Sequence, residues 1–144
     1  METTDPIKIF HTTLNESQKE EDDFFGSKNS MCSVPEFYKQ LFWKTRSIWQ
    51  FAEIIEKYKL DFTGKVLELG GGCGAHSAYL KTKYQDKIDL YYSDSSLNAL
   101  KASDHYESFF EIKIDNKWVA EAENIPTEAN AFDAIFFFAS FHHI

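Results

Sequence analysis

The sequence contains little cysteine and no long apolar run. Its two cysteines, Cys32 and Cys73, are too few for a disulfide framework or a metal site, so we expect reduced thiols and no metal. The longest apolar stretch, Ala134 to Ala139, is far too short to cross a bilayer, which argues against a membrane span. No secretory signal is visible near Met1, so a cytoplasmic location is the default expectation.

Positive charge is also scarce. The chain has 15 Lys and Arg residues against 23 Asp and Glu residues, which gives a net charge of −8. Proteins that bind nucleic acid normally carry a basic face, so this composition argues against a nucleic-acid partner. The 144 residues, 43% of them hydrophobic, match the size and core content of one folded domain.

The composition divides the chain into three segments. Residues 1–32 are polar and acidic without a lasting period, which predicts a flexible N-terminal arm; the alternative is a lid that closes over a site through Phe24 and Phe25. Residues 33–60 repeat apolar side chains at helical spacing, which predicts one long helix or two shorter ones. Residues 61–144 alternate between strand and helix patterns.

The third segment predicts an α/β fold, a Rossmann-like doubly wound parallel sheet. Such alternation implies parallel strands, right-handed crossovers and helices on both faces of the sheet. The sequence allows two positions for one further strand, residues 109–114 or residues 117–120. The other predicted elements are, in strand–helix alternation, residues 65–69, 75–83, 88–93, 96–106 and 131–139.

A glycine-rich loop follows the first of these strands. Four of the six glycines fall within residues 70–74, directly after Glu68 and Leu69. Glycine lets a backbone adopt positive φ and pass close to a ligand, and ligands of doubly wound sheets bind at the carboxyl ends of the strands. We therefore expect a ligand at this loop. Asp94, at the end of the next strand, is expected to bind ribose hydroxyls or to cap the following helix, and both roles can coexist.

The negative charge of Glu68 distinguishes between two classes of ligand, dinucleotides and ligands that carry positive charge. The loop also fits the glycine fingerprint of dinucleotide-binding oxidoreductases. A carboxylate two residues before the first glycine would repel a pyrophosphate, by ~1–4 kcal/mol for each charge pair near 4 Å. A ligand with an amine and a sulfonium, such as S-adenosylmethionine, has the opposite preference.

Four segments together resemble the class I S-adenosylmethionine-dependent methyltransferases, in the branch that acts on small molecules. They are Glu68–Gly74, Asp94, Glu121–Pro126 with Phe132–Ile135, and Ser140–Ile144. The resemblance covers about residues 62–144 and favours residues 117–120 as the third strand. It implies S-adenosylmethionine as cofactor, a small-molecule methyl acceptor as partner, and a domain with strand order 3-2-1-4-5-7-6.

The resemblance also implies a set of site residues. Glu68 and Gly70 would hold the methionine amino end, Asp94 the ribose, and Glu121, where the family usually has Asp, the adenine amino group. His142 and His143 are candidates for a general base, with structural packing as the alternative; aligned methyl transfer needs no dedicated catalytic residue. The full cofactor-binding set that we predict is Glu68, Gly70, Gly72, Asp94, Ser95, Glu121, Ala122 and Ala139.

The sequence ends just after the fourth strand of the seven that the family has. We therefore expect residues 61–144 to be an incomplete, N-terminal part of the domain, truncated after strand four. The apolar stretch 134–138 would then be an exposed sheet edge, at which chains can associate. Two other functions stay open at this point: an NAD(P)-dependent oxidoreductase, and a non-catalytic module that keeps the fold.

Overall fold

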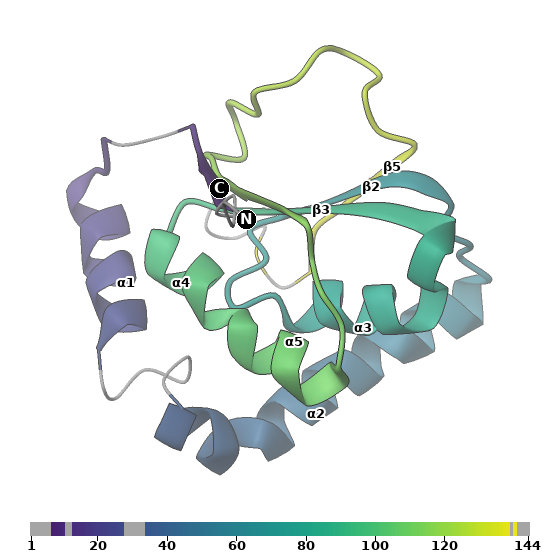
Figure 1. Ribbon diagram of the computed structural model, residues 1–144, viewed down its shortest axis with the longest axis horizontal. Coiled ribbons are helices and arrows are strands. Elements are labelled where there is room, and N and C mark those ends of the chain that lie inside the picture. Colours follow the sequence, from purple (N-terminus) through teal and green to yellow (C-terminus); the bar gives the residue numbers. More distant parts are fainter. Residues whose placement is uncertain (1–6, 11–12, 28–33, 139, 141–144) are drawn as a thin grey trace, which may run out of the picture.

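The computed structural model describes residues 7–10, 13–27, 34–138 and 140, with side chains described from residue 45 onward in the long second helix. Its centre is a five-stranded, all-parallel sheet with the order β1-β4-β3-β2-β5 (Figure 1). The strands are β1 (Ile7–Ile9), β2 (Gly64–Leu69), β3 (Ile88–Asp94), β4 (Asn116–Val119) and β5 (Ala134–Phe136). The helices are α1 (Glu16–Gly26), α2 (Val34–Tyr58), α3 (Ala75–Tyr84), α4 (Leu97–Ala102) and α5 (Asp104–Phe110), with a 3-10 turn at Gln85–Lys87.

The central strands confirm the Rossmann-like fold that the sequence predicts. In the order of the methyltransferase sheet, β4, β3, β2 and β5 occupy the positions 3-2-1-4. The third strand is at Asn116–Val119, as the resemblance favoured, whereas Phe109 and Phe110 belong to α5. The single helix predicted at 96–106 is instead two helices joined at Ser103, whose hydroxyl donates to the Leu100 carbonyl (2.7 Å) and so competes with the helical hydrogen bonds.

The direction of the chain explains which face of the sheet each connection covers. Right-handed crossovers from β2 to β3 and from β3 to β4 run in one direction and therefore lie on one face, where α3, α4 and α5 pack together with α2 (Figure 1). The chain then reverses to β5 on the other side of β2, and residues 120–133 cross the opposite face. This reversal places a topological switch point between β2 and β5, at which the ends of the strands leave a crevice.

The N-terminal region contains a strand and a helix that the sequence analysis did not predict, while its flexibility stays a prediction. Strand β1 pairs with β4, with Ile7 beside Lys117, and α1 begins with a capping box. The Asn15 side chain accepts from the Gln18 amide (2.9 Å), and the Gln18 side chain accepts from the Asn15 amide (3.0 Å). Because α1 contains no fully buried residue, its sequence lacks the apolar period that normally reveals a helix. The division at residues 32 and 60 stays a prediction.

The core lies between the sheet and its helical face. Val66, Leu80 and Leu100 belong to this core and have no exposed surface. On α2, the Phe51 ring stacks on Phe136 (5.3 Å between centroids) and contacts Phe138 (5.0 Å), which attaches this helix to the last strand. Helix α2 is continuous, which confirms the prediction of one long helix rather than the alternative of two shorter ones.

Strand β5 is an edge of the described sheet and is shorter than predicted. It covers Ala134–Phe136 rather than residues 131–139, and it pairs on one side only, with β2. Ile135 is 53% exposed and Phe137 is 41% exposed. The expected apolar edge is therefore present in the described part of the chain, and association through it stays a prediction.

Cys73 corrects one expectation. This residue of the glycine loop is buried and disulfide-bonded, so the predicted pair of reduced thiols is wrong. None of the helices in the described ranges is long and apolar enough to cross a membrane. The cytoplasmic location stays a prediction.

Lys117 is a buried cation in the centre of β4. Its side chain is 1% exposed and forms ion pairs with Glu107, which is 14% exposed, and with Asp104 (3.1 Å), which is 75% exposed. Removing one partner of a buried pair leaves an uncompensated charge, whereas apolar replacement of both partners is often neutral.

We therefore expect Glu107→Gln to lower the free energy of unfolding by roughly 3 kcal/mol, because Lys117 would keep only the exposed Asp104 as a partner. The double variant Lys117→Met/Glu107→Leu should unfold within about 1 kcal/mol of the wild type. Urea denaturation measures both values. Equal destabilisation of the single and double variants would contradict this account.

Candidate functional site

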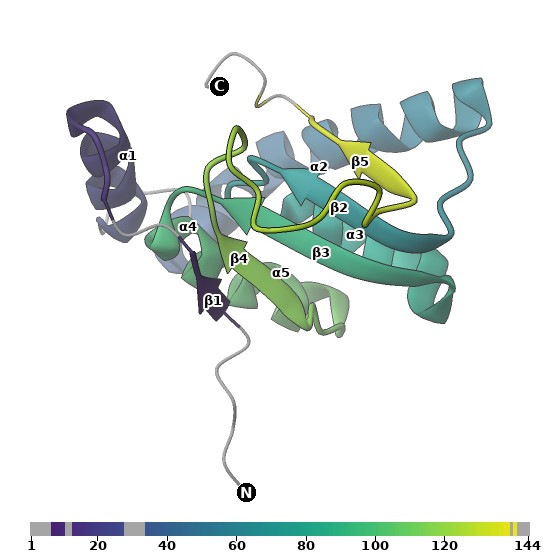
Figure 2. The same ribbon diagram turned by 90° about the horizontal axis from the view of Figure 1, so that it is seen from above.

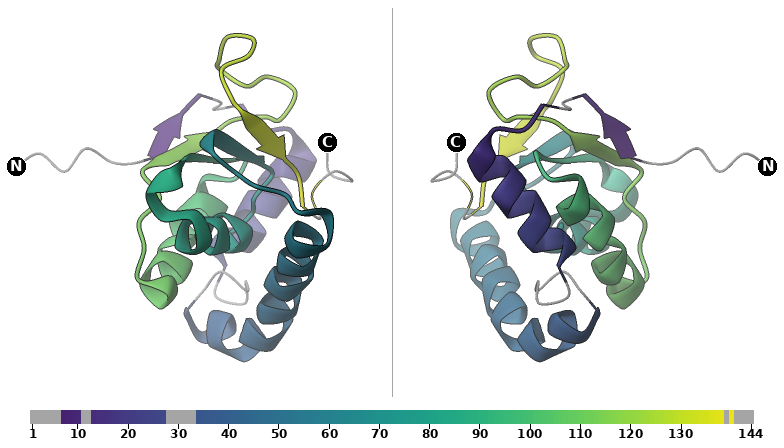
Figure 3. Two further views of the ribbon diagram at one scale, coloured as in Figure 1. Left: turned by 90° about the vertical axis from the view of Figure 1, so that its right-hand side faces the viewer. Right: turned by 90° about the vertical axis from the view of Figure 1, so that its left-hand side faces the viewer.

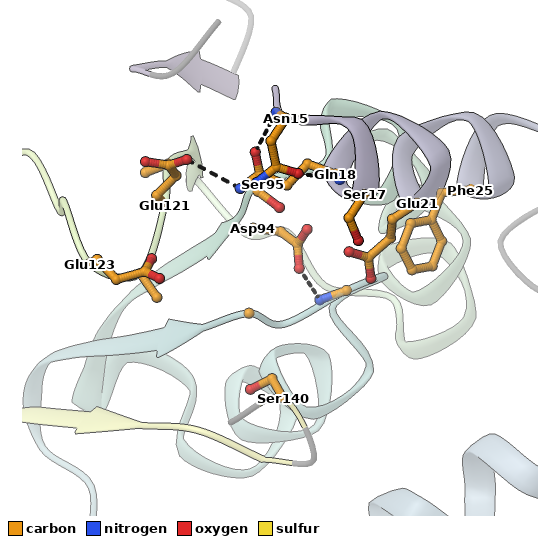
Figure 4. A pocket seen from close by; sticks show the side chains of 14 residues that line it. Asn15, Ser17, Gln18, Glu21, Phe25, Asp94, Ser95, Glu121, Glu123 and Ser140 are labelled. Atoms are coloured by element: carbon orange, nitrogen blue, oxygen red, sulfur yellow. Dashed lines mark hydrogen bonds between the residues drawn. The ribbon is translucent and has the colours of Figure 1, made fainter. Parts of the chain in front are cut away.

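A cavity of about 480 Å³ lies at the carboxyl ends of the strands. The arrowheads of β2 and β3 point toward α1, which stands beyond them (Figure 2). One wall is the glycine loop with Ser140, a second is formed by Asp94 and Ser95, and a third by residues 120–123. The fourth wall comes from α1 and its cap, through Asn15, Ser17, Gln18, Glu21 and Phe25 (Figure 4).

The Asp94 carboxylate joins two of these walls. It accepts hydrogen bonds from the backbone amides of Gly72 (2.8 Å) and Ser96 (2.9 Å), so it fixes the glycine loop to the start of α4. The N-cap of α4 is Ser96, whose hydroxyl accepts from the Ala99 amide (3.0 Å). Asp94 is therefore not the capping residue itself, and its carboxylate faces the cavity (Figure 4).

Burial dominates the protonation behaviour of Asp94. The residue is 9% exposed, and this desolvation raises the pKa of its carboxyl group to about 6. The two amide hydrogen bonds act in the opposite direction, while the negative charges of Glu21 and Glu68 add to the increase in pKa. Asp94 is thus an acid that titrates close to neutral pH.

Two glycines of the loop have conformations that a side chain would strain. Gly70 and Gly72 have φ values of +64° and +57°. A Cβ atom on Gly70 would lie 2.8 Å from the Ser140 Cβ atom, whereas a Cβ atom on Gly72 would meet no atom within 4 Å. Gly72 therefore presents bare backbone to open space in the cavity, and the Tyr92 hydroxyl anchors it from behind by donating to its carbonyl.

Glu68 lies beneath the loop and does not line the cavity. Its side chain is fully buried, and one carboxylate oxygen accepts a hydrogen bond from the Ser77 hydroxyl. The other oxygen, Oε1, lies 3.5 Å from His76 Nδ1 and has no hydrogen-bond partner among the described residues. His76 continues this chain of contacts to α2, because its Nε2 atom lies 2.9 Å from the Ser47 hydroxyl. The predicted contact of Glu68 with a ligand stays a prediction.

Residues 120–123 form the wall that follows β4. The Ala120 amide donates to the Asp94 carbonyl (3.0 Å), which places this segment beside the end of β3. Gln18 on α1 donates from Nε2 to Glu121 Oε1 (3.2 Å). Glu121 therefore connects the third wall of the cavity to the fourth.

The structure brings most of the predicted site residues together. Those that line the cavity are Gly70, Gly72, Asp94, Ser95, Glu121 and Ala122. Ala139, His142 and His143 lie outside the described residues. Sequence reasoning missed the α1 wall, although the Asn15–Gln18 capping box was a usable signal for this helix. It also left Ala120 and Glu123 out of the predicted set, whereas Ser140, expected as an alternative to Ala139 beside the methionine part, lines the cavity.

The cavity is strongly acidic. Glu21, Asp94, Glu121 and Glu123 contribute four carboxylates, and no Lys or Arg occurs among the described residues that line it. No group of three or more His, Cys, Asp or Glu side chains in the described ranges has the geometry to hold a metal ion. The charge pattern suits a ligand that carries positive charge and hydrogen-bond donors.

Comparison with known proteins gives one family and several structures. The profile of a family described as a methyltransferase domain matches residues 66–144. A crystal structure from Methanococcus maripaludis, of a protein proposed to be an S-adenosyl-L-methionine-dependent methyltransferase, has 20% identity and a TM-score of 0.56, with 93% of our chain and 57% of that chain covered. The plantazolicin methyltransferase BpumL in complex with SAH has 20% identity and a TM-score of 0.46, with 85% and 49% covered.

The matched structures are longer than our chain, which spans 57% of the first one. At this level of identity the likeness concerns the fold. A comparison with curated protein sequences found no match.

Titration of Asp94 gives a testable dependence of stability on pH. Its folded-state pKa of about 6 lies above the ordinary value of 3.8, so the folded state binds the proton more tightly than the unfolded chain. The contribution of Asp94 to stability is therefore fully present below pH 3.8 and is lost as the pH rises to about 6, by about 3 kcal/mol at most.

Urea midpoints of the wild type and of Asp94→Asn, measured between about pH 4 and about pH 7, isolate this term because other carboxylates titrate in both proteins. The stability of the wild type relative to the variant should fall as the pH rises. A difference between the two proteins that does not change with pH would show that Asp94 titrates normally.

Proposed function

The chain belongs to the methyltransferase domain family, and on this premise we propose that its cavity binds S-adenosylmethionine as the methyl donor for a small-molecule acceptor. The observation that carries the proposal is the acidic cavity at the carboxyl ends of the strands, bounded by bare glycine backbone. S-Adenosylmethionine has an ammonium, a sulfonium and two ribose hydroxyls, each of which favours a carboxylate as neighbour.

Three features of the site support the fit of this cofactor. The volume of about 480 Å³ lies within the ordinary range of small-molecule sites. The missing side chain of Gly72 leaves space at the loop. The buried oxygen Glu68 Oε1, which has no hydrogen-bond partner in the described part of the chain, provides negative charge directly beneath that loop.

Three of the four walls of the cavity have a role in this proposal. Asp94, in its ionised form, accepts hydrogen bonds from the ribose hydroxyls, with Ser95 beside it. Glu121 and Ala122 hold the adenine end. Gly70 and Ser140 face the methionine part, and the buried Glu68 carboxylate beneath the loop attracts its ammonium group.

The same features count against a dinucleotide. A pyrophosphate needs free backbone amides or cationic side chains. Here the Gly72 amide already donates to Asp94, and the lining residues include carboxylates and no described Lys or Arg. The NAD(P)-dependent alternative is therefore disfavoured on charge as well as on hydrogen bonding.

Methyl transfer mainly requires alignment of the acceptor with the methyl group. S-Adenosylmethionine supplies an electrophilic methyl group with a good leaving group, so the protein contributes by orienting the acceptor in line with the methyl–sulfur bond and by excluding water. His142 and His143 remain the predicted candidates for removing a proton from the acceptor. The acidity of the chain supports a small molecule rather than a nucleic acid as the acceptor.

Isothermal titration calorimetry tests the proposal directly. We expect the wild type to bind S-adenosylmethionine and S-adenosylhomocysteine, and Asp94→Ala to weaken both by about 10- to 100-fold, because it removes charged hydrogen bonds to the ribose and frees the glycine loop. Asp86→Ala is the matched control, since Asp86 is exposed in the 3-10 turn and does not line the cavity.

Two results would overturn the proposal. Binding of NAD(H) in place of the adenosyl ligands would identify a dinucleotide site. Binding of neither ligand class would favour a non-catalytic module that keeps the fold.

A further inference from the structure

Helix α1 closes the cavity from outside the segment that the family profile matches. It lies against α4 (Figure 3), where the Asp22 carboxylate accepts from the Ser96 hydroxyl (2.5 Å) and from the Asn98 amide (3.0 Å). At one end Gln18 donates to Glu121 (3.2 Å), and at the other Phe25 packs against the buried cluster that contains Ala75 and Ala78. The helix is thus attached at three points and has a defined face toward the cavity.

Glu21 is the acidic residue on that face. It lines the cavity and is half-buried, and it stands across from Asp94 (Figure 4). Its negative charge contributes to raising the pKa of the Asp94 carboxyl group across the cavity. Glu21 has no hydrogen bond or ion pair with any residue in the described ranges, whereas its neighbour Asp22 is fully engaged with α4. Within the described residues, Glu21 is therefore a negative charge without a hydrogen bond or ion pair.

We propose that Glu21 strengthens binding of the methylated, positively charged cofactor relative to its demethylated product, an inference that rests on the proposed function. When the methyl group moves to the acceptor, the electron pair of the sulfur–carbon bond stays on sulfur, and the sulfonium becomes a neutral thioether. The acceptor gains the methyl group and releases its proton to solvent or to a base. The ligand thus loses one positive charge inside the cavity while its shape changes only by one methyl group.

A carboxylate beside the cavity responds to that change. For a carboxylate and a sulfonium separated by ~6–8 Å in a medium of effective dielectric ~40–80, Coulomb's law favours the charged form by about three- to tenfold. Because Glu21 has no cationic partner among the described residues, this attraction is not cancelled locally. Once the sulfonium charge has gone, Glu21 loses that part of its attraction for the bound ligand, and release of the product becomes easier.

The test compares the affinities of S-adenosylmethionine and S-adenosylhomocysteine in three versions of the whole chain. In Glu21→Gln, which keeps the size of the side chain, the ratio of the two affinities should fall by about three- to tenfold through weaker binding of S-adenosylmethionine alone. Glu20→Gln removes the same charge from an exposed position of α1 that does not line the cavity, and it should leave the ratio unchanged. Glu21→Lys, checked for folding by circular dichroism, should lower the ratio further.

The outcomes separate this inference from the function on which it rests. If the wild type binds both ligands and Glu21→Gln weakens both equally or neither, the inference fails and the proposed function stands. If the wild type binds neither ligand, both fail. A loss of the preference in Glu20→Gln as large as that in Glu21→Gln would also overturn the inference, because it would show an effect of net charge.

Discussion

The Asp94 carboxylate is the interaction on which the cavity depends. It accepts hydrogen bonds from two backbone amides, one in the loop after β2 and one in the turn before α4. These bonds set the distance between the glycine-loop wall and the Asp94–Ser95 wall of the cavity. The same group is buried against the space that it bounds. Burial of this carboxylate has a high desolvation cost, which is why its pKa is raised although two backbone amides stabilise the ionised form.

The strands of the sheet were predictable because their sequences are dominated by burial. Residues 66–69 are all buried, and such runs are typical of central parallel strands. Strand β5 was predicted too long because its apolar run continues past the point at which β2 ceases to pair with it. Helix α1 escaped notice for the opposite reason, since polar contacts such as that of Asp22 with Asn98 leave no apolar period in the sequence.

The site residues were predictable where they directly follow a strand in the sequence. The glycine loop and Asp94 are each attached to the end of a strand, so their places follow once the strands are known. The position of Glu68 was not accessible in this way, because it depends on the Ser77 hydroxyl and the His76 ring, which come from α3. The α1 wall was equally hidden, since Gln18 meets Glu121 across 103 positions of the sequence.

The place of α1 in the chain divides the residues that line the cavity into two groups, one inside and one outside the segment shared with the family. Residues 66–144 carry the part shared with the family, whereas the residues of α1 precede the matched segment. Because α1 buries no residue completely, its sequence can change with little effect on the core. The family match therefore describes three walls of the cavity, and the fourth wall, from α1, lies outside the matched residues.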